Sequence, residues 1–488
     1  MLKRTTTLAA AVLVAPLLLS PAEAEAEAET DAARNATRLA GKLVRTSSAD
    51  DAYTHLKKFQ QLADAAGGHR AAGSPGHDAS AAYIYQQLKK YGYDVSYDRF
   101  DFIYTETRAE RLKVLSPAPR DVAITAMTYT KSTPVGGIKA GLAAVPVDDT
   151  TGCQPADYAS GAFTGKIALI KRGGCTFGEK QTAAAGAGAA GAIIYNDADG
   201  VLTGTLGDPA AGRIPTGGVT KAEGEKLAAA LARRPARPVN LSLELRQLQE
   251  KRSTNNVIAE TRGGNAARTV MLGAHLDSVT AGPGINDNGS GSAGLLEVAQ
   301  ELAESRAKPA NKVRFAWWSA EENGLFGSKA YVANLSSAAR KEIKLYLNFD
   351  MIASPNPGLF VYDGDDSDST GAGPGPAGSA QLERDISAFL DRRGKQHEGT
   401  DLTGRSDYGP FIAAGIPSGG TFTGAEGVKT AAQARKFGGT AGVAYDSCYH
   451  AACDTLGNID MSVFAANIGV IANAVGTYAH DLNSLRQP

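Results

Sequence analysis

The sequence predicts an α/β sandwich that is interrupted by a smaller, β-rich module. After residue 253, apolar runs of strand length alternate with helical stretches, as in a mainly parallel sheet. Between about 112 and 246, short strands alternate with segments of Ala and Gly. A strand-like run at 94–104 precedes this region and is assigned to the sandwich, so the module is an insertion. A chain of 488 residues is also long for a single core.

The chain begins with a segment typical of a secretory signal peptide. Lys3 and Arg4 precede the apolar run LAAAVLVAPLLL, and Ala22-Glu23-Ala24 has the small-x-small pattern of a cleavage site. The run is shorter than the roughly 20 residues of a membrane-spanning helix. We therefore expect a signal peptide over 1–24 and a secreted, extracellular protein outside the membrane. The stretch 25–50 stays open between a short helix, a pro-segment and a disordered leader.

Charge and cysteine content narrow the class of protein. The net charge is −1, and Lys and Arg do not form runs, so nucleic acid and anionic membranes are not expected partners. Four cysteines occur, at positions 153, 175, 448 and 453. In an exported protein, an even number of cysteines favours two disulfides over a sulfur-rich metal site.

The elements of the sandwich follow from periodicity and capping. Residues 53–67 have helical periodicity, and Ser74 followed by Pro75 is a typical helix start. Strands are expected at 254–263, 268–278, 312–320, 343–353 and 358–364, with helices at 293–305, 324–335 and 379–394. One domain then comprises 51–111 and 247–488, and the inserted domain comprises 112–246. In such folds, chemistry is carried by the loops at the carboxyl ends of the strands.

Polar residues stand at the end of the strand predicted at 268–278. His275 by itself is more typical of a hydrogen-bonded structural residue than of a ligand. Asp277 changes this interpretation, because the two-residue period of a strand puts both side chains on one face, where a carboxylate can orient an imidazole for metal binding. Asp287 lies in GINDNGSGS, where the turn preference of Asp and Asn is an alternative explanation.

Carboxylates also follow the next two strands. Glu321 and Glu322 come after FAWWSA; they could be a solvated helix start, or could divide metal binding and proton transfer between them. Asp350 stands late in an apolar strand, where a carboxylate is costly to bury without a cation or hydrogen bonds.

The last histidine of interest stands between two cysteines. In DSCYHAACDT, a disulfide between Cys448 and Cys453 would fix Tyr449 and His450, although a simple surface staple is an equal alternative. Taken together, the candidate ligands form a nitrogen and oxygen set suited to zinc: His275, Asp287, Glu322, Asp350 and His450. Two zinc ions would be neutralised by three carboxylates and one hydroxide, which favours a two-metal hydrolytic site.

The motifs resemble those of the secreted di-zinc aminopeptidases, the family of bacterial leucyl aminopeptidases and aminopeptidase Y. They occur in the family's order as GAHLDS, GINDNGSG, SAEENGLFGS, NFDMI, GRSDYGPF and YHAACDT. The inserted region resembles a protease-associated (PA) domain in KIALIKRGGCTFGEKQTAAAGAGAAGAIIYND. The resemblance implies a three-layer α/β/α zinc-peptidase fold with a mixed, mainly parallel sheet.

The resemblance also implies roles for single residues. His275 and Asp350 would bind one zinc, Glu322 and His450 the other, and Asp287 would bridge them. Asp277 would support His275, and Glu321 would be the general base. Tyr449 would stabilise the tetrahedral intermediate, Arg405 would lie near the substrate, and Phe422 would line a pocket for an apolar first side chain. The implied disulfide cysteines are Cys153, Cys175, Cys448 and Cys453.

The expected function is therefore that of a zinc aminopeptidase that uses two Zn²⁺ ions. A zinc-activated water would attack the peptide bond, and Glu321 would move its proton to the leaving amine. The substrates would be peptides or proteins with a free N-terminus, preferably with Leu-like or aromatic first residues, and the protein is expected to be a monomer. Two alternatives remain: a carboxypeptidase or dipeptidase, in which Arg405 pairs with a terminal carboxylate, and a non-catalytic peptide-binding protein.

Overall fold

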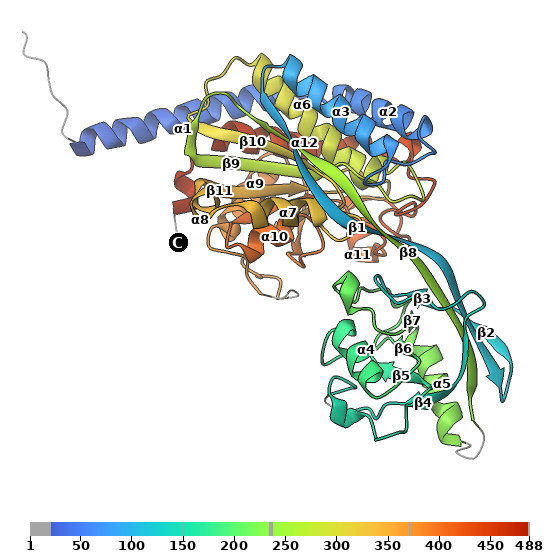
Figure 1. Cartoon of the computed structure of the whole chain (residues 1–488). Coiled ribbons are helices and arrows are strands. Elements are labelled where there is room, and N and C mark those ends of the chain that lie inside the picture. The colour runs from blue at the N-terminus through green and yellow to red at the C-terminus, as the bar shows by residue number, and fades with distance from the viewer. Residues whose placement is uncertain (1–20, 149, 234–237, 370, 372, 487–488) are drawn as a thin grey trace, which may run out of the picture. The chain divides into compact units, whose positions relative to one another are not determined.

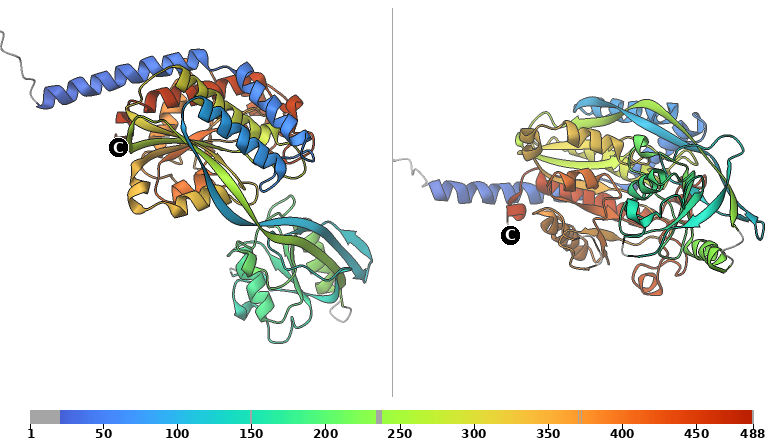
Figure 2. Two further views of the ribbon diagram at one scale, coloured as in Figure 1. Left: turned by 45° about the horizontal axis from the view of Figure 1, so that its top comes forward. Right: turned by 60° about the horizontal axis from the view of Figure 1, so that its bottom comes forward.

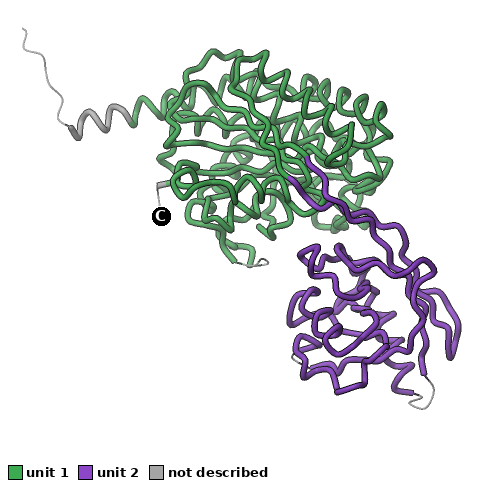
Figure 3. The backbone as a smooth tube through the Cα atoms, viewed as in Figure 1, with its two compact units in different colours: residues 1–100, 254–488 green, residues 101–253 purple. Residues whose placement is uncertain are grey.

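The structure is a computed structural model that describes residues 21–486, apart from 149, 234–237, 370 and 372. For residues 21–28 and 486 only the backbone is described. Residues 1–20 of the expected signal peptide lie outside the described part. The chain forms two compact units: unit 1 is made of residues 1–100 and 254–488, and unit 2 of residues 101–253 (Figure 3).

Unit 1 contains the mixed, mainly parallel sheet that the sequence predicts. The strand order is β13-β12-β14-β11-β9-β10-β8, and β1 pairs with β8. Figure 1 labels β11, β9, β10, β8 and β1 of this sheet. Neighbouring strands from β14 to β10 are parallel, whereas β8 is antiparallel to β10 and β12 is antiparallel to β14. The strands are β1 (Asp94–Ser116), β8 (Asn240–Glu260), β9 (Asn265–His275), β10 (Asn311–Trp318), β11 (Ile343–Phe349), β12 (Phe360–Asp363), β13 (Glu398–Asp401) and β14 (Ser418–Phe422).

Helices cover both faces of this sheet and complete the three layers (Figures 1 and 2). The helices on one face of the sheet pack against it in the larger apolar core of unit 1. They are α1 (Pro21–Thr46), α2 (Ala49–Asp64), α3 (Pro75–Lys90), α6 (Gly291–Glu304), α9 (Ser379–Arg392) and α12 (Met461–Tyr478). The opposite face carries α7 (Phe326–Asn334), α8 (Ser337–Glu342) and α10 (Tyr408–Ala413), and the short helix α11 (Ala431–Phe437) lies in a loop near the C-terminus.

Successive side chains of a central strand point to opposite faces of the sheet, so each strand contributes to both apolar cores. In β9, Val270, Leu272 and Ala274 belong to the core under α6 and α12, whereas Met271 points to the layer of α7 and α10. A strand buried on both faces must be apolar at successive positions, as β9 is. The near-continuous apolar runs of the sequence therefore correspond to central strands.

Capping explains where two of the helices begin. Oγ of Ser74 accepts a hydrogen bond from the main-chain N–H of His77 over 3.3 Å, and Pro75 occupies the first turn of α3, as predicted. Ser48 caps α2 in the same way through the N–H of Asp51. Helix α12 is apolar and long enough to cross a membrane, but most of it is buried within unit 1, so it serves as a core helix.

The stretch that the sequence left open as a leader contains helix α1. Leu39 and Leu43 on its second half are buried in the core of unit 1. Gly476 of α12 lies directly against it, because a Cβ atom at that position would come within 2.3 Å of Cα of Ala40. The second half of α1 is therefore part of the folded unit, and its cleavage as a pro-segment stays a prediction.

Unit 2 is the smaller, strand-rich module. Its strands are β2 (Arg120–Val122), β3 (Thr125–Ala126), β4 (Ile138–Ala144), β5 (Ile167–Lys171), β6 (Gly191–Tyr195) and β7 (Thr216–Val219), with helices α4 (Phe177–Gly186) and α5 (Lys221–Arg233). Strands β4 to β7 are parallel neighbours. A disulfide joins Cys153 to Cys175. The unit spans residues 101–253, and the long strands β1 and β8 each contribute residues to both units.

Candidate metal centre

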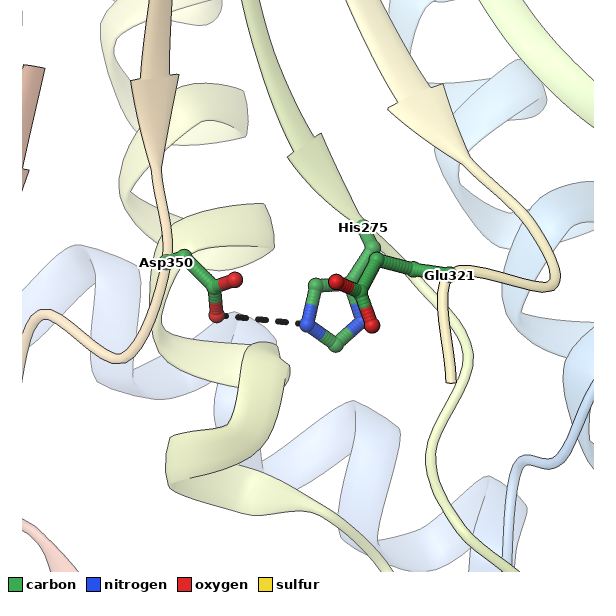
Figure 4. Close-up of side chains that lie close together, drawn as sticks. All are labelled: His275, Glu321 and Asp350. Atoms are coloured by element: carbon green, nitrogen blue, oxygen red, sulfur yellow. Dashed lines mark hydrogen bonds and ion pairs between the residues drawn. The ribbon is translucent and has the colours of Figure 1, made fainter. Parts of the chain in front are cut away.

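Three neighbouring parallel strands bring the first group of polar side chains together. His275 is the last residue of β9, Glu321 and Glu322 follow β10, and Asp350 follows β11. Nε2 of His275 lies 3.2 Å from Oδ1 of Asp350, and Figure 4 shows these two side chains facing each other beside Glu321. Ligand atoms of His275, Glu321 and Asp350 all lie within 4.8 Å of one another. The sheet edge thus gathers residues that are far apart in the sequence.

Asp287 links this group to a second one. It lies in the short helical segment η3 (Ile285–Ser290) before α6, and its side chain is buried. Its Oδ1 lies 3.2 Å from Nε2 of His275, and its Oδ2 lies 3.2 Å from Nε2 of His450. Nε2 of His450 is also 2.9 Å from Oε2 of Glu322. The two oxygens of one carboxylate therefore face two different histidines.

His450 is carried by a small covalent ring. Cys448 and Cys453 form a disulfide that encloses it, as the sequence predicts. The ring of Tyr449 stacks on the imidazole of His450 with a centroid separation of 3.8 Å. The backbone of His450 has a positive φ of 55°, which is uncommon for a non-glycine residue. The short disulfide loop fixes both rings at the rim of the site.

Asp277 lies behind His275 and organises two elements at once. Nδ1 of His275 lies 3.0 Å from the main-chain carbonyl oxygen of Asp277 and 3.8 Å from its carboxylate. Since a carbonyl can only accept, Nδ1 carries the proton of the neutral ring and Nε2 faces the carboxylates. The Asp277 carboxylate itself accepts the main-chain N–H groups of Glu321 and Glu322, over 3.2 and 3.3 Å. It therefore also fixes the turn that carries both glutamates.

Asp350 is held by a directed series of hydrogen bonds. Its Oδ2 accepts from Oγ of Ser406 over 2.5 Å, and Ser406 accepts from the side-chain amide of Asn348 over 2.8 Å. Asn348 accepts in turn from the hydroxyl of Tyr346 over 2.9 Å, and Tyr346 accepts from the indole N–H of Trp318 over 2.8 Å. Every donor points toward Asp350, so each bond polarises the next one toward its carboxylate.

The buried charges perturb one another strongly. Burial lowers the pKa of His450, but hydrogen bonds to Asp287 and Glu322 outweigh it and raise this pKa to about 11. Burial likewise opposes the charge on His275, yet Asp350 and Glu321 hold its pKa well above the ordinary value. Burial raises the pKa of Glu322 to about 7 and raises that of Glu321 well above its usual range. Burial therefore disfavours charge on both glutamates, whereas the surrounding carboxylates favour the protonated forms of the two imidazoles.

The donor set fits a divalent cation. Oε1 of Glu322 is buried and has no hydrogen-bond partner among the residues that the structure describes. Leaving such an oxygen unpaired is costly, and a cation would satisfy it. Two imidazole nitrogens and carboxylate oxygens without a thiolate are the ligands of catalytic zinc. One subset would hold an ion through His275, Asp287 and Asp350, and the other through Asp287, Glu322 and His450.

The site opens into a cavity of about 620 Å³. Its apolar wall includes Phe360, Phe422 and Tyr445, with ring centroids of Phe360 and Tyr445 5.4 Å apart. The cavity is also lined by Tyr449 and Arg405. Arg405 is largely exposed, and its guanidinium lies 3.3 Å from a carboxylate oxygen of Glu426. All the residues singled out from the sequence, except the supporting Asp277 and the disulfide cysteines, line this cavity.

Arg70 is a residue at this site that sequence reasoning missed. It is fully buried in the loop before α3, and its guanidinium donates to the carbonyl oxygens of Leu276, Pro283 and Gly284. All three belong to the segment between His275 and Asp287. Burial lowers its pKa to about 10, while Asp277 and Asp454 oppose that shift, so it stays a cation at neutral pH. A buried arginine in GGHRAAG has no periodic signal that could reveal it.

The motif GRSDYGPF also contributes more than the sequence analysis assigned to it. Besides Arg405, it supplies Ser406, which binds Asp350, and the buried Asp407, whose Oδ1 accepts from Oγ of Ser328 over 2.5 Å. Both residues lie within a motif that the sequence already singled out, so their place beside Arg405 was the available signal.

Comparisons with known proteins match both units. The family model described as peptidase family M28 matches residues 256–475, and the one described as PA domain matches residues 138–227. An aminopeptidase of Pseudomonas aeruginosa (strain UCBPP-PA14) is 44% identical over 450 residues, which cover 88% of this chain and 81% of that protein. Leucine aminopeptidase 2 of Trichophyton tonsurans is 44% identical over 433 residues, which cover 88% and 84%.

Solved structures show the same fold. An aminopeptidase from Aneurinibacillus sp. strain AM-1 is 29% identical with a TM-score of 0.72, and the match covers 89% of this chain and 95% of that one. BSAP, a zinc aminopeptidase from Bacillus subtilis, is 27% identical with a TM-score of 0.59, covering 88% and 94%.

Proposed function

The chain belongs to peptidase family M28 and is a metallo-aminopeptidase, and on this premise we propose that it releases large apolar N-terminal residues from peptides with a two-zinc site. The observation that carries the proposal is the placement of Asp287, one of whose oxygens faces His275 and the other His450. A carboxylate in this position can contact two ions, one on each side. The two subsets of ligands then share one residue and line one cavity.

In the proposed site, His275 and Asp350 would hold one ion, Glu322 and His450 would hold the other, and Asp287 would contribute to both. When bound, zinc supplies Lewis-acid chemistry, since it acidifies water and polarises a carbonyl oxygen. The neutral imidazoles would present Nε2 to the ions, since the main-chain carbonyl of Asp277 keeps the proton of a neutral His275 on Nδ1. The neighbouring residues thus fix the ligand geometry before substrate arrives.

Glu321 is the proposed general base. It comes directly before the ligand Glu322, and the Asp277 carboxylate holds the main-chain N–H groups of both residues. Burial raises its pKa well above the usual range, and the nearby His275 opposes this shift. A carboxylate of raised pKa accepts a proton from water more readily and can return it to the leaving amine. We assign to Tyr449, which stacks on His450 and lines the cavity, the role of donating a hydrogen bond to the oxygen of the attacked carbonyl.

The cavity supports a preference for an apolar first residue. Phe360 contacts both Phe422 and Tyr445, which gives an aromatic wall next to the ligands. One relative carries the name leucine aminopeptidase, in agreement with this proposal. Arg405 is already paired with Glu426, which reduces its capacity to hold a terminal carboxylate, and the acidic ligands suit a substrate's α-ammonium group. These features favour an aminopeptidase over a carboxypeptidase.

We propose that the protein acts outside the cytoplasm as a monomer. The two disulfides are typical of an oxidising compartment. The signal-like start of the sequence agrees with export.

A panel of aminoacyl p-nitroanilides, assayed with purified protein before and after chelation and again with zinc restored, tests the proposal. Leucyl and aromatic substrates should be cleaved fastest, chelation should abolish cleavage, and zinc should restore it. A C-terminally amidated peptide should be cleaved, whereas an N-acetylated peptide should not. Hydrolysis that persists after complete metal removal would contradict the mechanism.

A further inference from the structure

The residue after the disulfide ring of His450 contacts the loop of Asp287. We propose that this residue, Asp454, is a positioning residue. It joins the loop of Asp287 to the disulfide-closed loop that carries His450, so that both side chains face the same ion. The proposal rests on the two-zinc function and concerns a residue that contacts neither the ions nor the substrate. Asp454 is almost fully buried.

Asp454 accepts hydrogen bonds from the loop that carries Asp287. Oδ1 of Asp454 accepts the main-chain N–H of Asn286 over 2.8 Å, and Oδ2 accepts the main-chain N–H of Asp287 over 3.0 Å. The main-chain carbonyl of Asp454 accepts the N–H of Ile285 over 3.1 Å. Three consecutive N–H groups are thus bound by one residue, which fixes the backbone from which the Asp287 side chain extends.

Asp454 is also bound to the disulfide-closed loop that carries His450. Asp454 follows Cys453, the residue that closes the disulfide, and its N–H donates to the carbonyl of Ala451 over 3.1 Å. Its backbone is therefore a direct continuation of the segment that carries His450. Any shift of Asp454 relative to η3 would change the 3.2 Å separation between His450 and Asp287.

A second carboxylate, that of Asp446, connects the same two loops. The side-chain amide of Asn458, in the short helix η4 (Leu456–Asn458), donates to Oδ1 of Asp454 over 3.0 Å and to both oxygens of Asp446. Asp446 accepts the N–H of Cys448 over 2.8 Å and the side-chain amide of Asn286 over 2.7 Å. The same two chain segments are therefore joined twice, through Asp454 and through Asp446.

The chemistry of the site requires two acceptors at position 454. An asparagine there has nearly the same shape but only one acceptor oxygen, and its NH₂ group would face a main-chain N–H group. Two donors cannot bond each other, so one N–H of the Asp287 loop would be left unsatisfied and the loop would shift. Asp454→Asn therefore tests the positioning role with the smallest possible change in volume.

The experiment measures bound zinc, zinc affinity and kinetics for the purified wild-type protein and for Asp454→Asn. Zinc is titrated against a competing chelator, and folding is checked by circular dichroism. We expect a native spectrum, a zinc affinity weakened by roughly 10- to 100-fold in at least one site, and a fall in kcat by a similar factor, as for other residues that orient metal ligands. KM should change much less than kcat, because the substrate pocket is not altered.

Asp460→Asn is the matched control. Asp460 undergoes the same chemical change a few residues further along the chain, where its carboxylate caps α12 through the N–H groups of Ser462 and Val463. Asparagine is an equally good N-cap, so this variant should keep zinc affinity and kcat at the wild-type values.

The outcomes separate this proposal from the function on which it rests. If wild type binds two ions and hydrolyses leucyl substrates, but Asp454→Asn keeps the same zinc affinity and kcat, the positioning role is wrong and the function stands. If wild type itself binds no zinc, the proposed function fails. Should Asp454→Asn not fold, Asn458→Ala replaces it, because it removes the amide that holds the carboxylates of both Asp454 and Asp446 in place. A weaker zinc site supports the positioning role, and unchanged affinity overturns it.

Discussion

Nε2 of His450 lies 2.9 Å from Oε2 of Glu322, although the two residues come from a disulfide ring near the C-terminus and from the end of β10. Such a pair is an ion pair when the histidine is protonated and a pair of ligands when it is neutral. The fold therefore holds the two groups together before any substrate is present. A proton on His450 must leave when a metal ion binds.

Zinc binding should release protons at neutral pH. The carboxylates of Asp287 and Glu322 outweigh burial and raise the pKa of His450 to about 11, so its imidazole is protonated at pH 7 without zinc. Zinc requires the neutral ring, so the ion must displace this proton, and zinc affinity must rise with increasing pH. Calorimetric titration in two buffers of different ionisation enthalpy measures the number of protons. Equal heats in both buffers would show that no proton is released.

Removal of the buried guanidinium of Arg70 should destabilise unit 1. Arg70→Met leaves three buried carbonyl oxygens, those of Leu276, Pro283 and Gly284, without their donor. Loss of one partner of a buried charged network costs about 3 kcal/mol or more. Urea unfolding of the zinc-free protein measures this loss. Arg70→Lys should recover less than half of it, because an ammonium group cannot reproduce the planar fork of donors; full recovery by lysine would show that charge alone matters.

Interruption of the hydrogen-bond series behind Asp350 should have a graded effect. Tyr346→Phe removes the hydroxyl that joins Trp318 to Asn348, which costs about 1–2 kcal/mol in the free energy of unfolding. Its effect on kcat should be smaller than that of Ser406→Ala, which removes the donor bound directly to Asp350. Thermal unfolding and steady-state kinetics of both variants test this order. An equal or larger loss of kcat in Tyr346→Phe would contradict a series that ends on Asp350.

Glu297 should make unit 1 less stable as the pH rises. This buried residue of α6 accepts the N–H of Ser48, and burial raises its pKa to about 7 from an ordinary 4.5. The folded state therefore binds a proton that the unfolded state has released, so stability falls between pH 4.5 and about 7 and then stays constant. The full effect is about 3 kcal/mol. Glu297→Gln should remove this fall and raise the melting temperature at pH 8, whereas Glu304→Gln, on the exposed side of α6, should reduce the fall only slightly, because Glu304 is the weakest of the charges that raise this pKa.

The part of the site that sequence reasoning predicted follows from local patterns. His275, Glu322 and Asp350 each follow an apolar run of strand length, and parallel neighbouring strands must end at the same edge of the sheet. The βαβ alternation and the start of α3 at Ser74 were predictable for the same reason, since periodicity and capping act over a few residues.

The remainder depends on contacts between distant segments. Arg70 reaches loops more than two hundred positions away, and Asp454 binds N–H groups of η3. Neither residue has a repeating pattern, because a single buried hydrogen bond leaves no period in the sequence. The packing of α1 was similarly missed, although Leu39 and Leu43 are spaced by one helical turn, since a stretch rich in Ala and Glu can also remain outside a core.

In the proposed site, five residues would bind zinc and a sixth, Glu321, would move a proton. The most direct measurement is the zinc content of Glu321→Gln together with its turnover of a leucyl anilide. We predict a wild-type content of two zinc ions per chain and a fall in kcat of roughly 10²- to 10⁴-fold, as for loss of a general base. Full activity with unchanged zinc content would contradict the assignment of Glu321 as the base, and zinc loss in proportion to activity would make it a ligand instead.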